Sequence, residues 1–225
     1  MSHIAQNINE LRSRIPSDVK LVAVSKTKTI TEIREAMDAG IVYFGESKVQ
    51  ELTAKRQHIP NVQWHQVGHL QTNKVKYIAP FVHMIQSVDS YRILEEINRQ
   101  AKKHNRVIDC LLQVHIAKEE SKFGFSEDEI VDLLEDKLLQ HFNHVRLCGL
   151  MGMATFTDDM EAVRKEFRGL ADFFRRIREK YFSEIPSFCE LSMGMSDDYP
   201  IAIEEGATIV RIGSTIFGNS NIIRS

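Results

Sequence analysis

The chain has 225 residues, a length that suits one α/β barrel, and we expect a single domain over residues 1–225. Its 29 Lys and Arg residues nearly balance its 31 Asp and Glu residues, giving a net charge of −2. This balance argues against nucleic acid or an anionic membrane as the main partner. The sequence shows no apolar leader and no apolar stretch long enough to span a membrane, so we expect a cytoplasmic protein.

The three cysteines, Cys110, Cys148 and Cys189, lie inside apolar runs and show no C-x-x-C spacing. An odd number of cysteines without a disulfide framework indicates a reducing compartment and buried free thiols. Because no paired ligands occur at the spacing of a zinc site, we expect no metal.

A helix is predicted from about Ile4 to Arg14, and eight short apolar runs that alternate with amphipathic segments follow it. The predicted strands span residues 20–25, 41–45, 62–67, 83–88, 107–115, 145–151, 187–192 and 207–212. The predicted helices between them span residues 30–39, 47–57, 71–79, 90–104, 127–140, 158–181 and 197–205. Nearly continuous Val, Ile and Leu in the strands is typical of a parallel sheet buried on both faces. Eight such units predict an α/β fold, a (β/α)8 TIM barrel with an extra N-terminal helix.

Several predicted helix boundaries carry local signals. The segments 29–32, 47–50 and 126–129 each have the S/T-x-x-E/Q form of a capping box, which predicts that a helix starts there. Gly40 and Gly206 follow helical segments, at the position where a left-handed residue commonly ends a helix.

Lys26 directly follows the first predicted strand. A low-dielectric wall beside an open mouth favours the uncharged amine, which can attack an aldehyde and form a Schiff base. A solvated lysine that closes a strand is the ordinary alternative for any single lysine. Polar residues follow most of the other predicted strands as well, which predicts chemistry at the C-terminal mouth of the barrel. These strand-end residues are Lys26, Glu46, His65, Gln66, Asp89, His115, Ser192 and Arg211.

The loops after the last two strands are predicted to bind phosphate. Ser196 is expected to cap a short helix whose first turn holds Pro200. After the eighth strand, Gly213 lets the backbone approach an anion, and Ser214 and Thr215 offer hydroxyls beside exposed N–H groups. The alternative is that the glycines here only shape turns. An aldehyde-capturing amine and a phosphate site in one pocket indicate pyridoxal 5′-phosphate as the cofactor.

These segments resemble a known family, the single-domain pyridoxal-phosphate-binding proteins of vitamin B6 homeostasis, and are similar to the barrel domain of bacterial alanine racemases. The matching segments are 21–27, 44–46, 49–51, 64–74, 87–90, 149–151, 191–197 and 210–218. The resemblance implies a barrel like the alanine racemase N-terminal domain, with the cofactor on Lys26 as a Schiff base and Arg211 facing its pyridine nitrogen. The candidate cofactor-binding residues are Lys26, Ser47, His65, Ser192, Met193, Gly194, Ser196, Arg211, Gly213, Ser214 and Thr215.

The chain departs from the family's pattern at two places. Ser47 and Lys48 stand where the family usually has Asn-Tyr, and His115 stands where it has an asparagine-containing segment. The contacts made by those asparagines are therefore not carried over, although the Ser47 hydroxyl can donate a hydrogen bond.

The resemblance implies a non-enzymatic carrier and reservoir of pyridoxal phosphate that releases it to apo-enzymes, and we expect a monomer. Arg211 cannot give up its proton, so it should leave the pyridine nitrogen unprotonated and the cofactor a weak electron sink. Racemases that use arginine here add a tyrosine base from another domain, and only residues 219–225 follow the last barrel turn, so no such domain is expected. Packed or capping roles are the better interpretation for His65, His69 and His115.

Two alternatives stay open. One is a pyridoxal-phosphate-dependent amino-acid racemase or lyase of low activity, in which Lys26 serves one face of the substrate. The other is a cofactor-free aldolase, in which Lys26 forms a Schiff base directly with a phosphorylated ketone.

Overall fold

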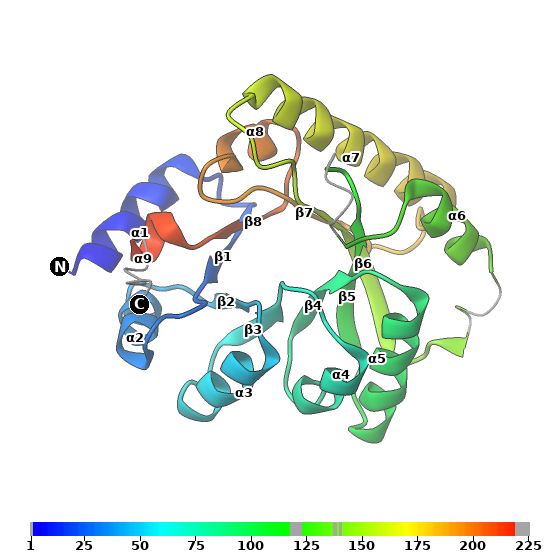
Figure 1. Ribbon diagram of the computed structural model, residues 1–225, viewed down its shortest axis with the longest axis horizontal. Coiled ribbons are helices and arrows are strands. Elements are labelled where there is room, and N and C mark those ends of the chain that lie inside the picture. The colour runs from blue at the N-terminus through cyan, green and yellow to red at the C-terminus, as the bar shows by residue number, and fades with distance from the viewer. Residues whose placement is uncertain (1, 118–122, 137–138, 140, 219–225) are drawn as a thin grey trace.

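Eight parallel strands, each paired with the next along the chain, close into a barrel through the pairing of the first strand with the last (Figure 1). The computed structural model describes residues 2–117, 123–136, 139 and 141–218. The strands are β1 (Lys20–Val24), β2 (Tyr43–Glu46), β3 (Gln63–Gln66), β4 (Met84–Val88), β5 (Ile108–Val114), β6 (Val145–Gly152), β7 (Glu190–Ser192) and β8 (Ile209–Ile212). The helices are α1 (His3–Arg14), α2 (Ile30–Asp38), α3 (Val49–His58), α4 (Thr72–Ile78), α5 (Tyr91–Lys103), α6 (Glu127–Glu135), α7 (Met160–Tyr181), α8 (Tyr199–Glu204) and α9 (Ser214–Phe217). The predicted barrel and its extra N-terminal helix are confirmed.

The strands are buried on both faces, as their apolar sequences predict. The larger core cluster lies between the sheet and the surrounding helices and includes the fully buried Phe44, Trp64 and Phe167. A smaller cluster, with Val22 and Met84, occupies alternate strand positions and therefore faces the barrel interior. Polar side chains fill much of the remaining interior, and they belong to the candidate site described below.

The local signals for helix boundaries succeed at some positions and fail at others. Thr29 and Ser126 form the predicted capping boxes of α2 and α6. The prediction at Ser47 is wrong: Lys48 holds the N-cap position of α3, with no side-chain cap hydrogen bond. Ser47 belongs instead to the end of β2, because its carbonyl oxygen accepts a hydrogen bond from Gln66 Nε2 at 3.1 Å. The helix predicted over 127–140 is shorter, since α6 ends at Glu135; residues 137, 138 and 140 lie outside the described residues.

The cysteines are free, and two of them are buried as predicted. Cys110 and Cys148 lie inside the barrel wall, whereas Cys189 is exposed, so the prediction of a buried thiol is wrong there. The reason is that β7 starts only at Glu190, which leaves Cys189 in the connection before the strand. Throughout the described ranges, no helix is both long and apolar enough to cross a membrane.

The short helix α9 is held by residues from the beginning of the chain, and Figure 1 shows α1 beside it. Asn7 Nδ2 of α1 donates to the carbonyl oxygen of Ile216 at 3.0 Å. Lys28 Nζ donates to the carbonyl oxygen of Gly218 at 3.1 Å. These contacts fix α9, which carries predicted phosphate-binding residues, against the end of β1.

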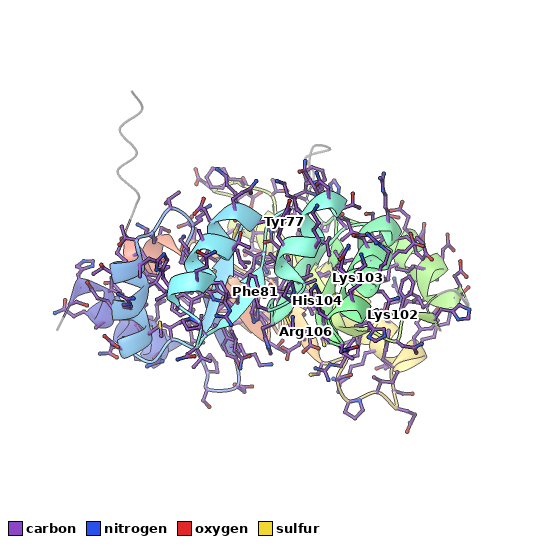
Figure 2. The ribbon with its side chains drawn as sticks, turned by 90° about the horizontal axis from the view of Figure 1, so that it is seen from below. Tyr77, Phe81, Lys102, Lys103, His104 and Arg106 are labelled. Carbon is purple, nitrogen blue, oxygen red and sulfur yellow. The ribbon has the colours of Figure 1, made fainter. Side chains whose placement is uncertain are left out.

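The C-terminal ends of α4 and α5 lie at the end of the barrel where the strands begin, because the helices run antiparallel to the strands. Arg106 joins the two helix ends by donating to the carbonyl oxygens of Ala79 at 2.6 Å and Val82 at 2.7 Å. Figure 2 shows Arg106 in this region together with Lys102, which is exposed.

Candidate cofactor-binding site

Lys26 and the turn after β8 lie at the same end of the barrel, because each follows the C-terminal end of one of two neighbouring strands, β1 and β8. Ala23 of β1 pairs with Ile212 of β8, so the residues that follow both positions emerge together. Lys26, Ser214 and Thr215 are all exposed at this C-terminal mouth. The parallel sheet thus brings the predicted amine and part of the predicted phosphate site together, although they lie at opposite ends of the sequence.

The Ser196 hydroxyl reaches the first turn of α9. Its Oγ accepts hydrogen bonds from the N–H groups of Gly213 and Thr215, both at 3.4 Å. A Cβ at Gly213 would lie 3.0 Å from the carbonyl oxygen of Val24, so a glycine lets this turn approach β1 closely. The resulting cluster of hydroxyl and N–H donors suits an anion. We call Ser196, Gly213 and Thr215 the donor cluster.

The loop before α8 differs from the prediction at Ser196. Asp198, not Ser196, holds the N-cap position of α8, while Pro200 lies in the first turn as predicted. Asp198 Oδ1 accepts the Met195 N–H at 2.5 Å and closes the loop, which leaves Ser196 turned toward α9.

Met193 and Gly194 extend the pairing of β7 with β8 toward the mouth. Met193 is fully buried and its N–H donates to the carbonyl oxygen of Ile209 at 3.1 Å. The Gly194 carbonyl oxygen accepts the Arg211 N–H at 3.0 Å. Gly194 has a φ of +90°, and a Cβ there would lie 2.6 Å from that of Ala202, so this close approach to α8 requires glycine.

Arg211 is a buried cation. Its side chain donates from Nη1 to Ser192 Oγ at 2.6 Å and from Nη2 to the carbonyl oxygen of Gly152 at 2.9 Å. Among the described residues, no carboxylate lies within ion-pair distance of it. Burial lowers the pKa of Arg211 to about 10, against the opposing charge of Asp198, so the guanidinium stays protonated at neutral pH.

A chain of hydrogen bonds continues from Arg211 across the barrel interior. Because arginine only donates, the Ser192 hydroxyl that accepts from it donates its own proton to Gln86 Oε1, at 2.7 Å. The Gln86 amide then donates from Nε2 to His65 Nδ1 at 2.8 Å, which leaves the His65 proton on Nε2. Burial, aided by nearby positive charges, lowers the pKa of His65 to about 3, so this ring is neutral.

Side chains of α3 bind the peptide groups on both sides of Lys26. Lys55 Nζ donates to the carbonyl oxygen of Ser25 at 2.7 Å, and Glu51 Oε2 accepts the Thr27 N–H at 2.8 Å. The Lys55 ammonium also lies 3.3 Å from Glu51 Oε2. Burial alone would raise the pKa of Glu51, but its hydrogen bonds from Thr27 and Lys55 outweigh it and lower that pKa.

Glu46 is the buried counter-charge of Lys55. Its Oε1 accepts from Lys55 Nζ at 2.8 Å and from Ser25 Oγ at 2.6 Å. Burial raises the pKa of the Glu46 carboxyl despite these two hydrogen bonds. Its other oxygen, Oε2, is buried without a hydrogen-bond partner in the described part of the chain.

Other predicted residues lie apart from the donor cluster. Ser47 is half-buried at the end of β2, and His65 lies inside the barrel at the end of the hydrogen-bond chain. His115 Nε2 is 2.8 Å from the carbonyl oxygen of Ala117, within its own loop.

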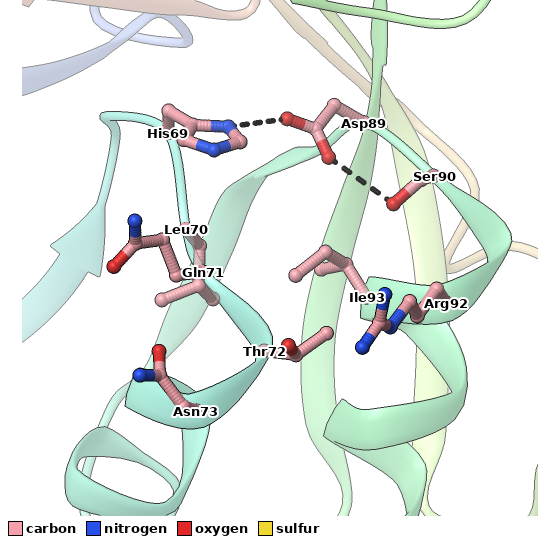
Figure 3. Close-up of a pocket in the computed structure, with 9 residues that line it drawn as sticks. All are labelled: His69, Leu70, Gln71, Thr72, Asn73, Asp89, Ser90, Arg92 and Ile93. Atoms are coloured by element: carbon pink, nitrogen blue, oxygen red, sulfur yellow. Dashed lines mark hydrogen bonds and ion pairs between the residues drawn. The ribbon is translucent and has the colours of Figure 1, made fainter.

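His69 lies in a surface pocket between the loops that lead into α4 and α5. Figure 3 shows its ring directed at Asp89, with Nδ1 2.7 Å from Asp89 Oδ2. One face of the His69 ring stacks on the ring of Phe123, and the two ring centroids are 3.7 Å apart. Neither Lys26 nor Arg211 lines this pocket, so it is separate from the donor cluster.

Sequence reasoning missed three residues of this site, Gln86, Glu51 and Lys55. Gln86 carries a usable signal, because Gln86 and Ser87 are polar residues in the middle of the strand Met84–Val88, whose other residues are apolar. Glu51 and Lys55 have the i, i+4 spacing of an ion pair, but that spacing is common on solvated helix faces and does not indicate a site.

The donor set fits pyridoxal 5′-phosphate. Lys26 offers an exposed primary amine for the aldehyde, and the donor cluster offers hydroxyl and N–H groups for the phosphate. The buried Arg211 guanidinium, which has no ion-pair partner among the described residues, offers a donor for the ring nitrogen. The aldehyde, the phosphate and the ring nitrogen of the cofactor each therefore have a candidate partner of matching chemistry.

Comparisons with known proteins identify the family to which this chain is similar. The family model described as "Alanine racemase, N-terminal domain" matches residues 1–221. The "Pyridoxal phosphate homeostasis protein" of Aquifex aeolicus (strain VF5) is 38% identical over 215 residues, which cover 95% of this chain and 92% of that protein. The structure of PipY of Synechococcus elongatus PCC7942 with PLP bound has a TM-score of 0.87 at 34% identity, covering 96% of this chain and 100% of that chain. An alanine racemase of Clostridium difficile 630 shares the fold, with a TM-score of 0.72 at 14% identity over 97% of this chain and 56% of that chain.

The closed barrel and the matched family model define the class, that of the alanine racemase N-terminal domain. Identity to the Aquifex protein over nearly the full length of both chains narrows the class further. The chain belongs to the family of pyridoxal phosphate homeostasis proteins. The resemblance inferred from the sequence is confirmed.

Proposed function

We propose that this chain binds pyridoxal 5′-phosphate as a Schiff base on Lys26 and acts as a carrier and reservoir in vitamin B6 homeostasis. The observation that carries the proposal is that Lys26 and the donor cluster meet at one mouth from adjacent strands. The PLP-bound structure of PipY and the names of the full-length relatives support it.

Bound pyridoxal phosphate supplies an aldehyde that a primary amine captures reversibly. Lys26 would provide that amine, and the donor cluster with Ser214 would hold the phosphate. Arg211 would donate a hydrogen bond to the ring nitrogen and keep its own proton, because a pKa of about 10 leaves it charged at neutral pH. Ser192 holds the guanidinium in place at 2.6 Å.

The histidines considered as catalytic bases have other hydrogen-bond partners. His65 is buried and bonded to Gln86, His69 is paired with Asp89, and His115 contacts the carbonyl oxygen of Ala117. This distribution supports a protein that holds the cofactor for apo-enzymes rather than one that turns over an amino acid.

Replacement of Lys26 tests the attachment site. We expect Lys26→Ala to abolish the visible absorbance band that forms when the protein is mixed with pyridoxal phosphate. In the unsubstituted protein, borohydride should fix the cofactor's mass on a peptide that contains Lys26. Lys102→Ala is the matched control, since Lys102 is exposed at the opposite end of the barrel (Figure 2), and it should keep the full band. A band that survives in Lys26→Ala would contradict the proposal.

A transfer assay tests the carrier role. In stopped-flow mixing with an apo-transaminase, we expect the loaded protein to reconstitute activity faster than an equal concentration of free pyridoxal phosphate. Equal rates would remove the carrier role. The racemase alternative predicts instead that the protein exchanges the α-proton of an amino acid in deuterated buffer, and that Lys26→Ala abolishes this exchange.

A further inference from the structure

We propose that Glu51 and Lys55 of α3 are positioning residues that hold the backbone of Lys26 in the conformation needed to capture an aldehyde. The inference rests on the proposed function for its ligand, while the contacts that carry it are made by the chain alone. In this proposal neither side chain binds the cofactor. Both act through the main chain of Lys26.

The first observation is that the two peptide groups flanking Lys26 are bound from the same helix. Lys55 Nζ holds the carbonyl oxygen of Ser25 at 2.7 Å, and Glu51 Oε2 holds the N–H of Thr27 at 2.8 Å. A lysine side chain leaves the backbone along its Cα–Cβ bond, and these two peptide planes set the direction of that bond. Fixing both planes therefore fixes the direction in which the Lys26 side chain leaves the backbone.

The second observation is backbone strain directly after the lysine. Thr27 has a φ of +64°, a left-handed conformation that is unfavourable for a β-branched residue. The charge-assisted hydrogen bond from its N–H to Glu51 stabilises this conformation. Without that bond we expect Thr27 to move toward negative φ, which would rotate the peptide group that follows Lys26.

The third observation is that Lys55 is buried and its hydrogen bonds are saturated, while Glu51 is half-buried; we call this pair of residues the clamp. The Lys55 side chain is only 9% exposed, and its ammonium contacts three oxygens, on Ser25, Glu46 and Glu51, at 2.7, 2.8 and 3.3 Å. These three contacts use all three ammonium protons, so the group has one orientation. A surface ion pair on a helix would not be fixed in this way.

The test first removes the carboxylate of Glu51 and then relieves the backbone strain at Thr27 that this carboxylate stabilises. We expect Glu51→Ala to weaken the equilibrium constant for forming the visible band with pyridoxal phosphate by about tenfold, the size expected of relieved backbone strain. Glu51→Gln keeps an acceptor oxygen and should retain most of the binding. Adding Thr27→Gly to Glu51→Ala should restore part of it, because glycine adopts positive φ without strain. Gln50→Ala, an exposed neighbour on α3, is the matched control.

A second readout does not depend on the cofactor. In the protein without pyridoxal phosphate, the exchange of the Thr27 amide hydrogen with deuterium should accelerate in Glu51→Ala and stay slow in Gln50→Ala. If Glu51→Ala fails to fold, Glu51→Asp, whose carboxylate is one methylene shorter, replaces it in both measurements.

The outcomes separate the two proposals. Unchanged binding and unchanged Thr27 exchange in Glu51→Ala would overturn the positioning role, as would weakened binding that Thr27→Gly fails to improve. If the unsubstituted protein forms no band at all, the proposed function fails, and the exchange of the Thr27 amide still decides whether the clamp exists.

Discussion

Arg211 sets the direction of every hydrogen bond that follows it in the barrel interior. Since a guanidinium has no acceptor, Ser192 must donate to Gln86, and Gln86 must donate to His65. Replacing Gln86 by an apolar residue would leave Ser192 and His65 buried without these partners, which is more costly than losing a single hydrogen bond. This series of hydrogen bonds therefore holds Arg211 through side chains that are all buried.

The neutral state of His65 predicts how stability depends on pH. Its pKa is lowered from 6.5 to about 3 in the folded protein, first by burial. Its stabilising contribution is therefore complete above pH 6.5 and is lost as the pH falls toward 3, because the unfolded chain then binds a proton that the folded protein does not. Between pH 8 and pH 5 this loss is about 2 kcal/mol in the free energy of unfolding.

Urea unfolding of the unsubstituted protein and of His65→Asn at both pH values checks this prediction. Asparagine keeps an acceptor near the Nδ1 position but does not titrate. We expect the variant to lose less stability between pH 8 and pH 5, by about 2 kcal/mol. The same pH dependence in both proteins would show that His65 is protonated in the folded state or does not contribute.

At the scale of single residues, the sequence indicated the residues that follow strands. It did not indicate the side chains that form hydrogen bonds with the backbone beside them. Lys26, Ser196 and Arg211 could be proposed as site residues because a parallel barrel gathers its strand ends at one mouth. The clamp residues Glu51 and Lys55 were not, because an ordinary helix spacing does not reveal that its side chains reach the backbone of another element.

At the scale of elements, the pairing of β6 with β7 depends on a glycine, Gly149, which has no side chain. Gly149 has a φ of +150°, and a Cβ there would lie 1.8 Å from the carbonyl oxygen of Glu190. No relaxation of a side chain removes this overlap, because the atom in the way is backbone. The contact also lies close to Ser192, so β6 and β7 must pair closely for the interior hydrogen bonds to form.

The same substitution at two glycines should have opposite effects on stability. Gly149→Ala should destabilise the fold by about 3 kcal/mol or more, because the strands must separate. Gly169→Ala should stabilise it by about 0.5–1 kcal/mol, since Gly169 lies on the exposed side of α7 and a Cβ there meets nothing within 4 Å. Thermal unfolding of both variants measures the difference. A Gly149→Ala protein as stable as the unsubstituted one would contradict the role assigned to this contact.

Helix starts were predictable where the capping side chain has only its own helix to bind. Thr29 and Ser126 satisfy that condition and form their capping boxes. Ser47 and Ser196 have the same local chemistry but lie next to other elements: the backbone carbonyl oxygen of Ser47 is bound by Gln66, and the Ser196 hydroxyl is bound by the first turn of α9. Local sequence could not reveal those competing partners.

At the scale of the whole molecule, the barrel was the most predictable feature. Eight buried strands alternating with amphipathic helices leave few other arrangements, and the observed order of strands follows the sequence without exception. Interior composition was less predictable, because periodicity shows that a strand face is buried but not whether polar side chains satisfy one another there.

Closure of the barrel by β1 and β8 has a consequence for a chain made on the ribosome. Lys26 follows the first strand, whereas Arg211 and Thr215 belong to the last strand and the turn beyond it. Synthesis proceeds from the N-terminus, so Lys26 leaves the ribosome long before Arg211 and Thr215 do. On the proposed function, a nascent chain therefore carries Lys26 before the rest of its site exists, and only a chain that includes β8 and α9 would retain the cofactor.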